Sequence, residues 1–259
     1  MDEIKNEKIT KIENYHFDER FYCKENEDGS RIYQPSVTYI LGVAYPSGYG
    51  LEHWRGDVGN KRADEILEQS GEDGTFVHSA IEGILKGESV ASTLINERFN
   101  PRRSLKIHRC LKAFLDWHAE FNPEVLKTES VVWSDEHGFA GTLDLICRIK
   151  NKKGEEKTVL VDFKTSKSIQ ASHKAQIVAY GLCETVDAVA ILQLGNTTAK
   201  KYSFLVLKPD ERDNYIHQFI SANQLFKSIY PDAKPSEEKF PEIFALTNQT
   251  QGETPCTER

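Results

Sequence analysis

Residues 138–149 read GFAGTLDLICRI, and residues 158–164 read TVLVDFK. Both stretches are rich in β-branched and aromatic residues, and the polar NKKGEE at 151–156 between them is typical of a turn. The sequence therefore predicts a β-hairpin. Asp144 and Asp162 lie equally far from Lys153, so a turn centred there would pair them across the hairpin, with Cβ atoms roughly 4.5–5.5 Å apart.

Two carboxylates this close repel each other, and apolar neighbours make their charged forms costly to bury. Those neighbours include Leu143, Leu145 and Val161. A divalent cation relieves both penalties, and oxygen ligands suit Mg²⁺ or Mn²⁺. Lys164 shares a strand face with Asp162, where it could hold a water for attack on a phosphate. The alternative is a surface hairpin whose Asp and Lys side chains form solvated ion pairs.

Four stretches follow one another in an order that resembles the PD-(D/E)XK nuclease superfamily, and within it the RecB-like exonuclease branch. They are GTFVH at 74–78, GTLD at 141–144, VDFKTS at 161–166 and QIVAYG at 176–181. That branch has a helical His, then Gly-x-x-Asp, then Asp/Glu-x-Lys, then a helical Gln-x-x-x-Tyr. The upstream PSVTYIL at 35–41 is similar to phage nucleases of this group and to the mitochondrial genome maintenance exonuclease.

The resemblance implies a restriction-endonuclease-like α/β core, with a mixed central β-sheet flanked by helices. It implies that the catalytic residues are Asp144, Asp162, Lys164 and Gln176. The metal ligands would be His78, Asp144, Asp162 and the backbone carbonyl of Phe163, with Glu129 as a candidate further ligand. The substrate contacts would come from Tyr180, Ser166, Lys167, Ser36 and Thr38.

Several of these residues also have ordinary structural explanations. A lone helical His such as His78 is commonly a packed core side chain, Glu129 could face solvent from an edge strand, and Tyr180 could be an amphipathic core residue. Glu82, one helical turn after His78, could reach the site or remain a solvated surface residue. His173 precedes the next helix and could contact phosphate. An imidazole ligand would favour Mn²⁺ over Mg²⁺.

The two aspartates and the lysine predict hydrolysis of a phosphodiester by metal-activated water. The resemblance implies that the substrate is DNA and that the protein is an exonuclease of DNA processing, repair or recombination. A structure-specific or restriction-like endonuclease would use the same residues. A noncatalytic DNA-binding recombination accessory protein would be expected to lack an essential carboxylate or lysine, and none is missing. DNA, single-stranded or with free ends, is the expected partner, and a recombination or replication protein is a further one.

Composition fits one enzyme domain with extensions, because the 259 residues are 39% hydrophobic and 28% charged. The net charge of −7 argues against a uniformly basic face, so DNA would meet local basic clusters and bound metal. The five cysteines are scattered without a Cys-x-x-Cys, which predicts the reduced thiols of a cytoplasmic protein. Some RecB-like nucleases carry an iron–sulfur cluster on one early and three late cysteines, but here only Cys256 follows Cys183, so no such cluster is expected. The resemblance to phage nucleases implies a bacterial or phage-infected cell. No apolar run approaches the roughly 18 residues of a membrane span, so no membrane partner is expected.

Hydrophobic periodicity predicts the order of the elements. The GEDGT stretch at 71–75 is typical of a helix start, after a weak helical pattern from 51 to 69. The further elements expected are a helix from Ser104, strands at 127–134, 138–149 and 157–164, a helix at 171–184, strands at 188–194 and 202–207, and a helix at 210–230. The domains expected are an N-terminal hairpin and helical extension at 1–70, a nuclease core at 71–230 and a polar, partly disordered tail at 231–259.

Overall fold

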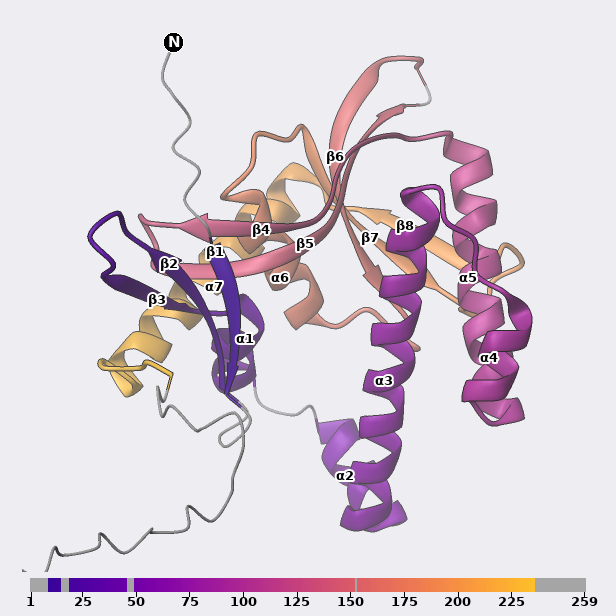
Figure 1. Cartoon of the computed structure of the whole chain (residues 1–259), viewed down its shortest axis with the longest axis horizontal. Helices are drawn as coiled ribbons and strands as arrows, with labels where there is room; N and C mark the ends of the chain where they lie inside the picture. The colour runs from indigo at the N-terminus through magenta and orange to yellow at the C-terminus, as the bar shows by residue number, and fades with distance from the viewer. Residues whose placement is uncertain (1–8, 15–18, 46–48, 152, 236–259) are drawn as a thin grey trace, which may run out of the picture.

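The computed structural model describes residues 9–14, 19–45, 49–151 and 153–235 (Figure 1). A small antiparallel sheet is formed in the order β1 (Ile9–Asn14), β2 (Glu19–Glu25) and β3 (Arg31–Pro35). A larger sheet has the order β4 (Glu124–Ser134), β5 (Phe139–Lys150), β6 (Glu156–Lys164), β7 (Ala188–Leu194) and β8 (Tyr202–Val206).

The larger sheet is mixed. Its neighbouring strands are antiparallel except for β6 and β7, which run parallel and are connected through α6 (Ala171–Gly181). A parallel pair requires a crossover, and a helix is its usual form. The chain is therefore an α/β protein with a five-stranded mixed sheet, as the sequence predicted.

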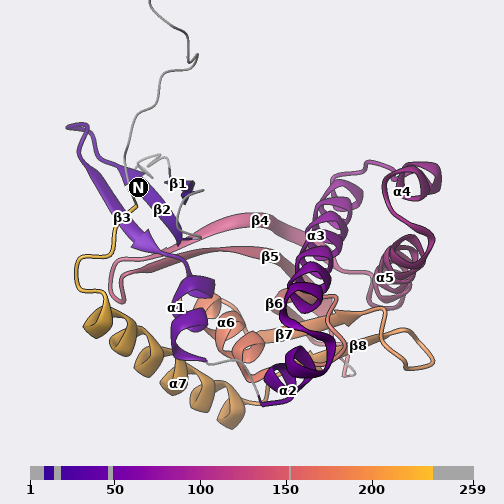
Figure 2. The same ribbon diagram turned by 90° about the horizontal axis from the view of Figure 1, so that it is seen from below.

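Helices cover both faces of this sheet (Figure 2). On one face lie α3 (Asn60–Leu85), α4 (Ser92–Arg98) and α5 (Pro101–Phe121), which enclose a core containing Trp117 and Phe163. On the other lie α1 (Val37–Ala44), α6 and α7 (Pro209–Ile229), around Phe139 and Phe219. The remaining helix, α2 (Tyr49–Val58), packs against α3. Each face of the sheet thus has its own apolar core.

The long helix α3 differs from the prediction. It begins at Asn60 and continues through Gly71 and Gly74, so the predicted helix start at 71–75 is wrong. Each interior glycine costs a helix about 1 kcal/mol relative to alanine. The buried carboxylate of Asp73 lies 2.6 Å from Arg103 Nε and 3.3 Å from Lys106 Nζ, both on α5. This tertiary contact holds the glycine-containing turn in the helix, which a local pattern does not reveal.

The helix also runs across the expected division between residues 1–70 and 71–230. A second difference is α4, since residues 92–98 were not expected to be helical. The other predicted strands and helices from Ser104 onward are confirmed, with ends displaced by three residues or fewer. Residues 236–259, most of the expected polar tail, lie outside the described residues.

The predicted β5–β6 hairpin is confirmed, with its turn where the sequence placed it. Cα partners run from Lys150 opposite Glu156 to Leu145 opposite Val161, where the ladder ends. Continuing this register would place Asp144 opposite Asp162, but the strands separate before that pair. The two aspartates therefore stand at the mouth of a gap in the sheet.

The side-chain direction in β5 changes at this gap. Leu143 packs in the core beneath α6, whereas Leu145, two residues later, packs in the core beneath α3. In a regular strand these two residues would share a face. Strand irregularities of this kind redirect side chains and are over-represented beside active sites. The irregularity leaves Asp144 between the two faces.

Four cysteines of the described residues are free thiols, of which Cys23, Cys110 and Cys147 are buried. Burial raises the pKa of the Cys147 thiol to about 12 and that of Cys110 to about 11. Both thiols therefore stay protonated near neutral pH, as expected of structural cysteines. Among the helices of the described ranges, none is both long and apolar enough to cross a bilayer.

Candidate active site

The carboxylate of Asp144 lies in the gap between β5 and β6. Its Oδ2 accepts a hydrogen bond from the backbone N–H of Phe163 at 2.6 Å. The side chain thus takes the place of a strand carbonyl at the point where the ladder has ended. Charge-assisted hydrogen bonds to backbone N–H groups favour the ionised carboxylate.

The helical His78 reaches this carboxylate from α3. Its Nδ1 lies 3.1 Å from Asp144 Oδ1, and its ring packs edge-on against Phe163 with centroids 5.8 Å apart. Burial by itself lowers the pKa of His78, but the charge of Asp144 and the hydrogen bond to it raise the pKa overall. Burial would raise the pKa of Asp144, yet His78, Lys164 and the Phe163 N–H hold it below its usual value. The pair is thus a partly buried ion pair whose imidazole is 27% exposed.

Glu129 completes a group with these two residues. It sits in β4 between residues paired with Leu143 and Leu145, which puts it across from Asp144. Its φ of +42° is uncommon for a side-chain-bearing residue in a strand, and such strain clusters at functional sites. Ligand atoms of His78, Glu129 and Asp144 all lie within 4.8 Å of one another. Glu82 is not part of this group of possible ligands, and its carboxylate pairs with Lys86 Nζ at 2.5 Å.

A second group extends from Asp162 toward α6. Lys164 Nζ lies 2.6 Å from Asp162 Oδ2 and donates a hydrogen bond to Gln176 Oε1 at 3.0 Å. Gln176 Nε2 in turn donates to the hydroxyl of Tyr180 at 3.0 Å. The spacing of Asp162 and Lys164 along a strand, and of Gln176 and Tyr180 along a helix, predicted that each pair shares a face. The structure links both pairs into one chain of polar contacts.

The carboxylate of Asp162 is the most deeply buried acid of the two groups, at 2% exposure. Burial raises its pKa to about 6, although the Lys164 ammonium opposes the shift. Lys164 Nζ, 2.6 Å from Asp162 Oδ2, and the more distant His78 favour the ionised carboxylate without cancelling the effect of burial. A buried carboxylate is costly to ionise even when it is paired. Further positive charge at this place would lower that cost.

Tyr180 is fixed by close packing as well as by its hydroxyl. A Cβ on Gly141 would lie only 2.4 Å from Tyr180 Cε1, so the ring rests directly on the glycine backbone. The adjacent Thr142 hydroxyl forms a 2.9 Å hydrogen bond with the hydroxyl of Tyr22, from β2 of the small sheet. Glycine in the GTLD stretch is therefore required by contact with the tyrosine of the later QIVAY stretch. The two stretches are therefore in direct contact.

The expected substrate contacts are dispersed. Ser36 is buried and caps α1, because its Oγ accepts the Tyr39 N–H at 3.1 Å. Thr38 is exposed on α1. Ser166 and Lys167 are exposed in the loop after β6, where Ser166 Oγ donates to a backbone carbonyl at 2.9 Å. Of these four, only Thr38 lines the cavity beside Gln176. Ser36 has a capping role that accounts for its position.

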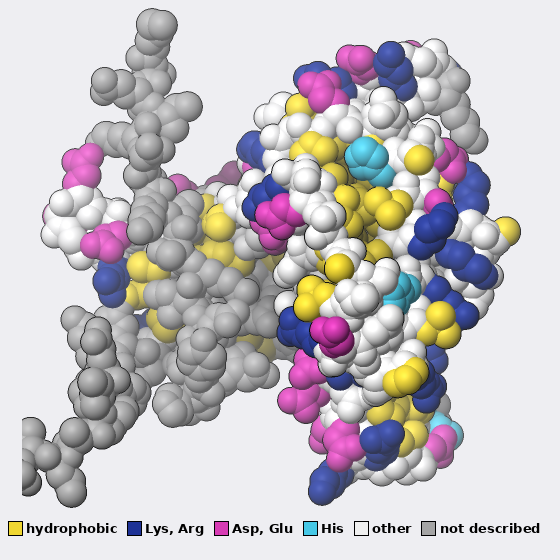
Figure 3. Space-filling model, turned by 45° about the vertical axis from the view of Figure 1, so that its right-hand side comes forward, with side chains coloured by type: hydrophobic (Ala, Val, Ile, Leu, Met, Phe, Trp, Pro, Cys, Tyr) yellow, Lys and Arg dark blue, Asp and Glu magenta, His cyan; other side chains and the backbone are white. Residues whose placement is uncertain are grey.

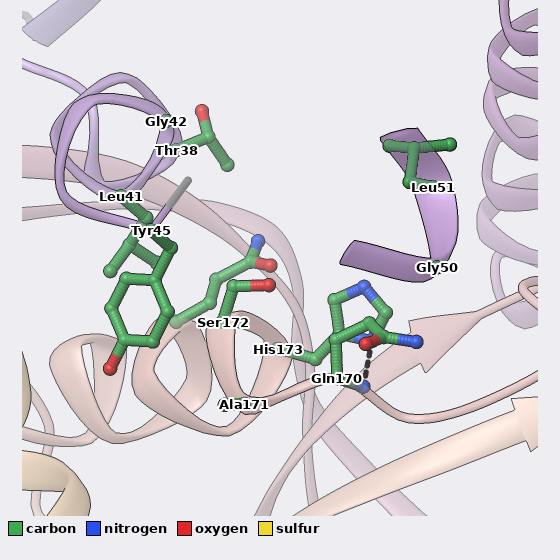
Figure 4. A pocket seen from close by; sticks show the side chains of 11 residues that line it. Thr38, Leu41, Gly42, Tyr45, Gly50, Leu51, Gln170, Ala171, Ser172 and His173 are labelled. Carbon is green, nitrogen blue, oxygen red and sulfur yellow. Dashed lines mark hydrogen bonds between the residues drawn. The ribbon is translucent and has the colours of Figure 1, made fainter. Parts of the chain in front are cut away.

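A cavity of about 860 Å³ opens beside the second group (Figure 4). One wall comes from α1 and the start of α2, and the other from the first turns of α6. Gln176 belongs both to this lining and to the Lys164 contact chain. His173 also lines it, and burial lowers the pKa of this imidazole to about 4, with a further contribution from Lys164. His173 is therefore neutral at physiological pH.

The two groups bring together most of the residues implied for catalysis and metal binding: His78, Glu129, Asp144, Asp162, Lys164, Gln176 and Tyr180. Phe163 contributes its N–H to Asp144, while a ligand role for its carbonyl stays a prediction. Sequence reasoning missed Tyr22 and the cavity residue Tyr45. Neither carries a local signal, because each approaches the site from an element distant in sequence.

Comparison with known proteins does not assign the chain to a family. No protein-family model matches the chain, and no curated protein matches it. Among solved structures, the chain is similar to one described as "Crystal structure of SSO0001", with a TM-score of 0.31 and 18% sequence identity. The alignment covers 52% of this chain and 64% of that chain, which is less than two thirds of its length. A likeness of this size carries no argument about fold or activity.

Proposed function

We propose that the chain is a metal-dependent DNA nuclease with a PD-(D/E)XK core, most simply an exonuclease of DNA processing, repair or recombination. The observation that carries the proposal is the meeting of four separate sequence stretches at the gap between β5 and β6. His78 contacts Asp144, and Asp162, Lys164 and Gln176 form a continuous chain beside them. Structural ion pairs do not require residues of two helices and two strands to converge in this way.

The donor groups fit a divalent cation. His78, Glu129 and Asp144 offer one imidazole nitrogen and two carboxylate oxygens within 4.8 Å of one another. This mixture suits Mn²⁺ well and Mg²⁺ through the oxygens. The raised pKa of the buried Asp162 carboxyl, to about 6, is consistent with a place where added positive charge is favourable. A bound cation would polarise a phosphoryl oxygen and lower the pKa of its water ligand.

The chain's own residues would divide the remaining work. Lys164 is positioned by Asp162 on one side and Gln176 on the other, so its ammonium can orient a water and offset charge that develops on phosphate. The Phe163 N–H fixes the orientation of the Asp144 carboxylate. His78 would either hold the cation with Asp144 or, without a cation, remain paired to that carboxylate.

Two other functions use the same residues. A structure-specific or restriction-like endonuclease would use the same chemistry but would bind DNA away from a free end. A noncatalytic DNA-binding accessory protein is disfavoured by the presence of both aspartates and the lysine in contact with other site residues. A recombination or replication protein remains a proposed partner.

The surface is consistent with local rather than uniform DNA contacts. In the view of Figure 3, Lys and Arg side chains are interspersed with Asp and Glu rather than gathered on one basic face. The net charge of −7 agrees with this distribution. Binding would therefore depend more on the cation and the neighbouring cavity than on broad attraction to the phosphate backbone.

The experiment that tests the proposal compares end-labelled single-stranded DNA, end-labelled duplex and a covalently closed single-stranded circle, each with Mg²⁺ or Mn²⁺. An exonuclease degrades the molecules with ends and spares the circle. Cutting of the circle would assign an endonuclease instead. EDTA should abolish cleavage of every substrate. Absence of cleavage with either metal on all three substrates would contradict a nuclease function.

A further inference from the structure

The cavity beside Gln176 has two chemically different walls. Leu41 and Tyr45 of α1 and Leu51 of α2 supply apolar and aromatic surface, and Gln170 and Ser172 at the start of α6 supply amide and hydroxyl groups. Figure 4 shows these side chains arranged around a common space. Its volume of about 860 Å³ lies in the range of small-molecule sites, which is roughly 300–1,000 Å³.

No Lys, Arg, Asp or Glu is among the described residues that line this cavity. Its one titratable imidazole, His173, is neutral at physiological pH. A lining of this kind is unsuited to a phosphate group, whose charge would lack a partner. It suits an uncharged, flat group with hydrogen-bonding edges and an apolar face. A nucleobase has both properties, and it stacks favourably on aromatic rings.

The ring of Tyr45 is held in place for such a contact. Its hydroxyl donates a 2.9 Å hydrogen bond to Gln218 Oε1 on α7, which anchors one edge of the ring. Across the cavity, the His173 ring accepts a 3.2 Å hydrogen bond from the backbone N–H of Gln170, and the Gln170 side-chain amide donates to Ser168 Oγ at 2.7 Å. The aromatic wall and the polar wall are therefore both pre-organised, which reduces the entropy lost on binding.

The cavity is also next to the proposed chemistry. Gln176 lines it and, through its Oε1, accepts the hydrogen bond from Lys164 Nζ at 3.0 Å. A strand whose phosphodiester lies at Lys164 therefore has a neighbouring nucleotide within reach of the cavity. A base can enter only if it is unpaired, because a base pair buries the hydrogen-bonding edge and stacks both faces.

We infer that this cavity is a nucleobase subsite, in which an unpaired base of the substrate strand stacks against Tyr45 and offers its edge to the amide and hydroxyl groups of α6. The inference rests on the proposed nuclease function and makes it more specific. Single-stranded DNA, or a duplex end whose terminal bases separate, becomes the substrate class. The base in the cavity then sets which phosphodiester reaches Lys164.

Abasic substitution tests this directly. Short end-labelled single strands, each with one abasic position, are cleaved in Mn²⁺, and the rate at each phosphodiester is measured from the product lengths. We expect a loss of about 5- to 100-fold at one phosphodiester at a fixed offset from the abasic position. Rates at the other phosphodiesters should be unchanged, because an intact base occupies the cavity when each of them is cleaved.

Two variants locate the effect. Tyr45→Ala removes the stacking surface, and Thr38→Trp fills the space from an exposed position of α1. Each should slow cleavage of the intact strand by a similar factor and should no longer respond to the abasic position. The matched controls are Tyr230→Ala and Leu94→Trp, at exposed positions outside the cavity lining, which should keep the wild-type pattern.

The outcomes separate this inference from the function on which it rests. Cleavage by the wild type with no position-dependent abasic effect overturns the subsite and leaves the nuclease function standing. An abasic effect that persists in Thr38→Trp also overturns the subsite, even if Tyr45→Ala fails to fold, as judged by circular dichroism. A wild type that cleaves no DNA overturns both proposals.

Discussion

The two groups of the site are built in different ways. The group of His78, Glu129 and Asp144 comes from α3, β4 and β5, and its ligand atoms meet at a strained and irregular part of the sheet. The group of Asp162 and Lys164 comes from β6 and is joined to α6 by consecutive polar contacts that end on a buried tyrosine. The first group is partly open, and the second is buried at Asp162 and Tyr180 but reaches the cavity through Gln176.

The difference indicates that the two groups have different roles. An open group of carboxylates and imidazole can exchange its internal contacts for a cation without rearranging a core. A lysine held by an aspartate, a glutamine and a packed tyrosine keeps one position before and after a substrate arrives. Pre-organised charge of this kind costs little reorganisation during the reaction. We therefore expect that changes in the first group act on metal binding and that changes at Lys164, Gln176 or Tyr180 act on rate.

The largest expected effect comes from Lys164→Ala. Cleavage should fall by about a hundredfold or more, because charge that develops on phosphate loses its cationic partner. Mn²⁺ binding should remain measurable by calorimetry, since the first group is intact. Lys112→Ala, at an exposed lysine of α5, is the matched control. Full activity in Lys164→Ala would remove the lysine from the mechanism.

The next test concerns the first group. Mn²⁺ should raise the melting temperature of the wild type. At a free Mn²⁺ concentration a hundred times the dissociation constant, the free energy of unfolding should increase by about 2.7 kcal/mol. Asp144→Asn and Glu129→Gln should each lose most of this response, because a carboxylate ligand becomes a neutral amide. Glu82→Gln, on the helix of His78 but paired with Lys86, should keep it. An unchanged Mn²⁺ response in both ligand variants would show that the cation binds elsewhere.

A smaller effect is expected from Gly141→Ala. The new methyl group would overlap the ring of Tyr180, whose nearest carbon would be 2.4 Å away. Overpacking of this kind typically costs about 1–3 kcal/mol, and the displaced ring should also slow cleavage through Gln176. Gly71→Ala is the control, because that helical glycine has open space around it and should be stabilised by up to about 1 kcal/mol. Chemical denaturation of the two variants would measure both effects, and equal stabilities would contradict the packing argument.

The smallest effect is expected from Tyr180→Phe. The variant keeps the ring on Gly141 but removes the hydroxyl that accepts from Gln176. Stability should fall by about 0.5–1.5 kcal/mol, the usual range for one hydrogen bond. Cleavage should slow while the Mn²⁺ response of the melting temperature stays at the wild-type level. A variant that loses the metal response instead would show that the two groups are not separable.

Much of this architecture could be predicted from local pattern. The hairpin turn, the positions along the chain of the strands β4 to β8 and the helix of Gln176 follow from alternation, turn residues and helical spacing. The contact between Asp162 and Lys164 follows from their separation by two residues in a strand. Helix α3 could not be predicted correctly, because the buried ion pair of Asp73 with Arg103 outweighs the glycine signal at 71–74.

Local sequence is enough to show which chemical groups this protein carries and which of them share a strand or helix face, because the repeat of a strand or a helix is set by backbone geometry. Packing between distant segments is needed to explain why the pairing of β5 and β6 ends at Leu145 and Val161, so that Asp144 binds the Phe163 N–H instead of facing Asp162. The same packing places the ring of Tyr180 on Gly141 and brings Tyr45 and the start of α6 to one cavity. These contacts join residues far apart in the chain, and packing rather than local conformation fixes them.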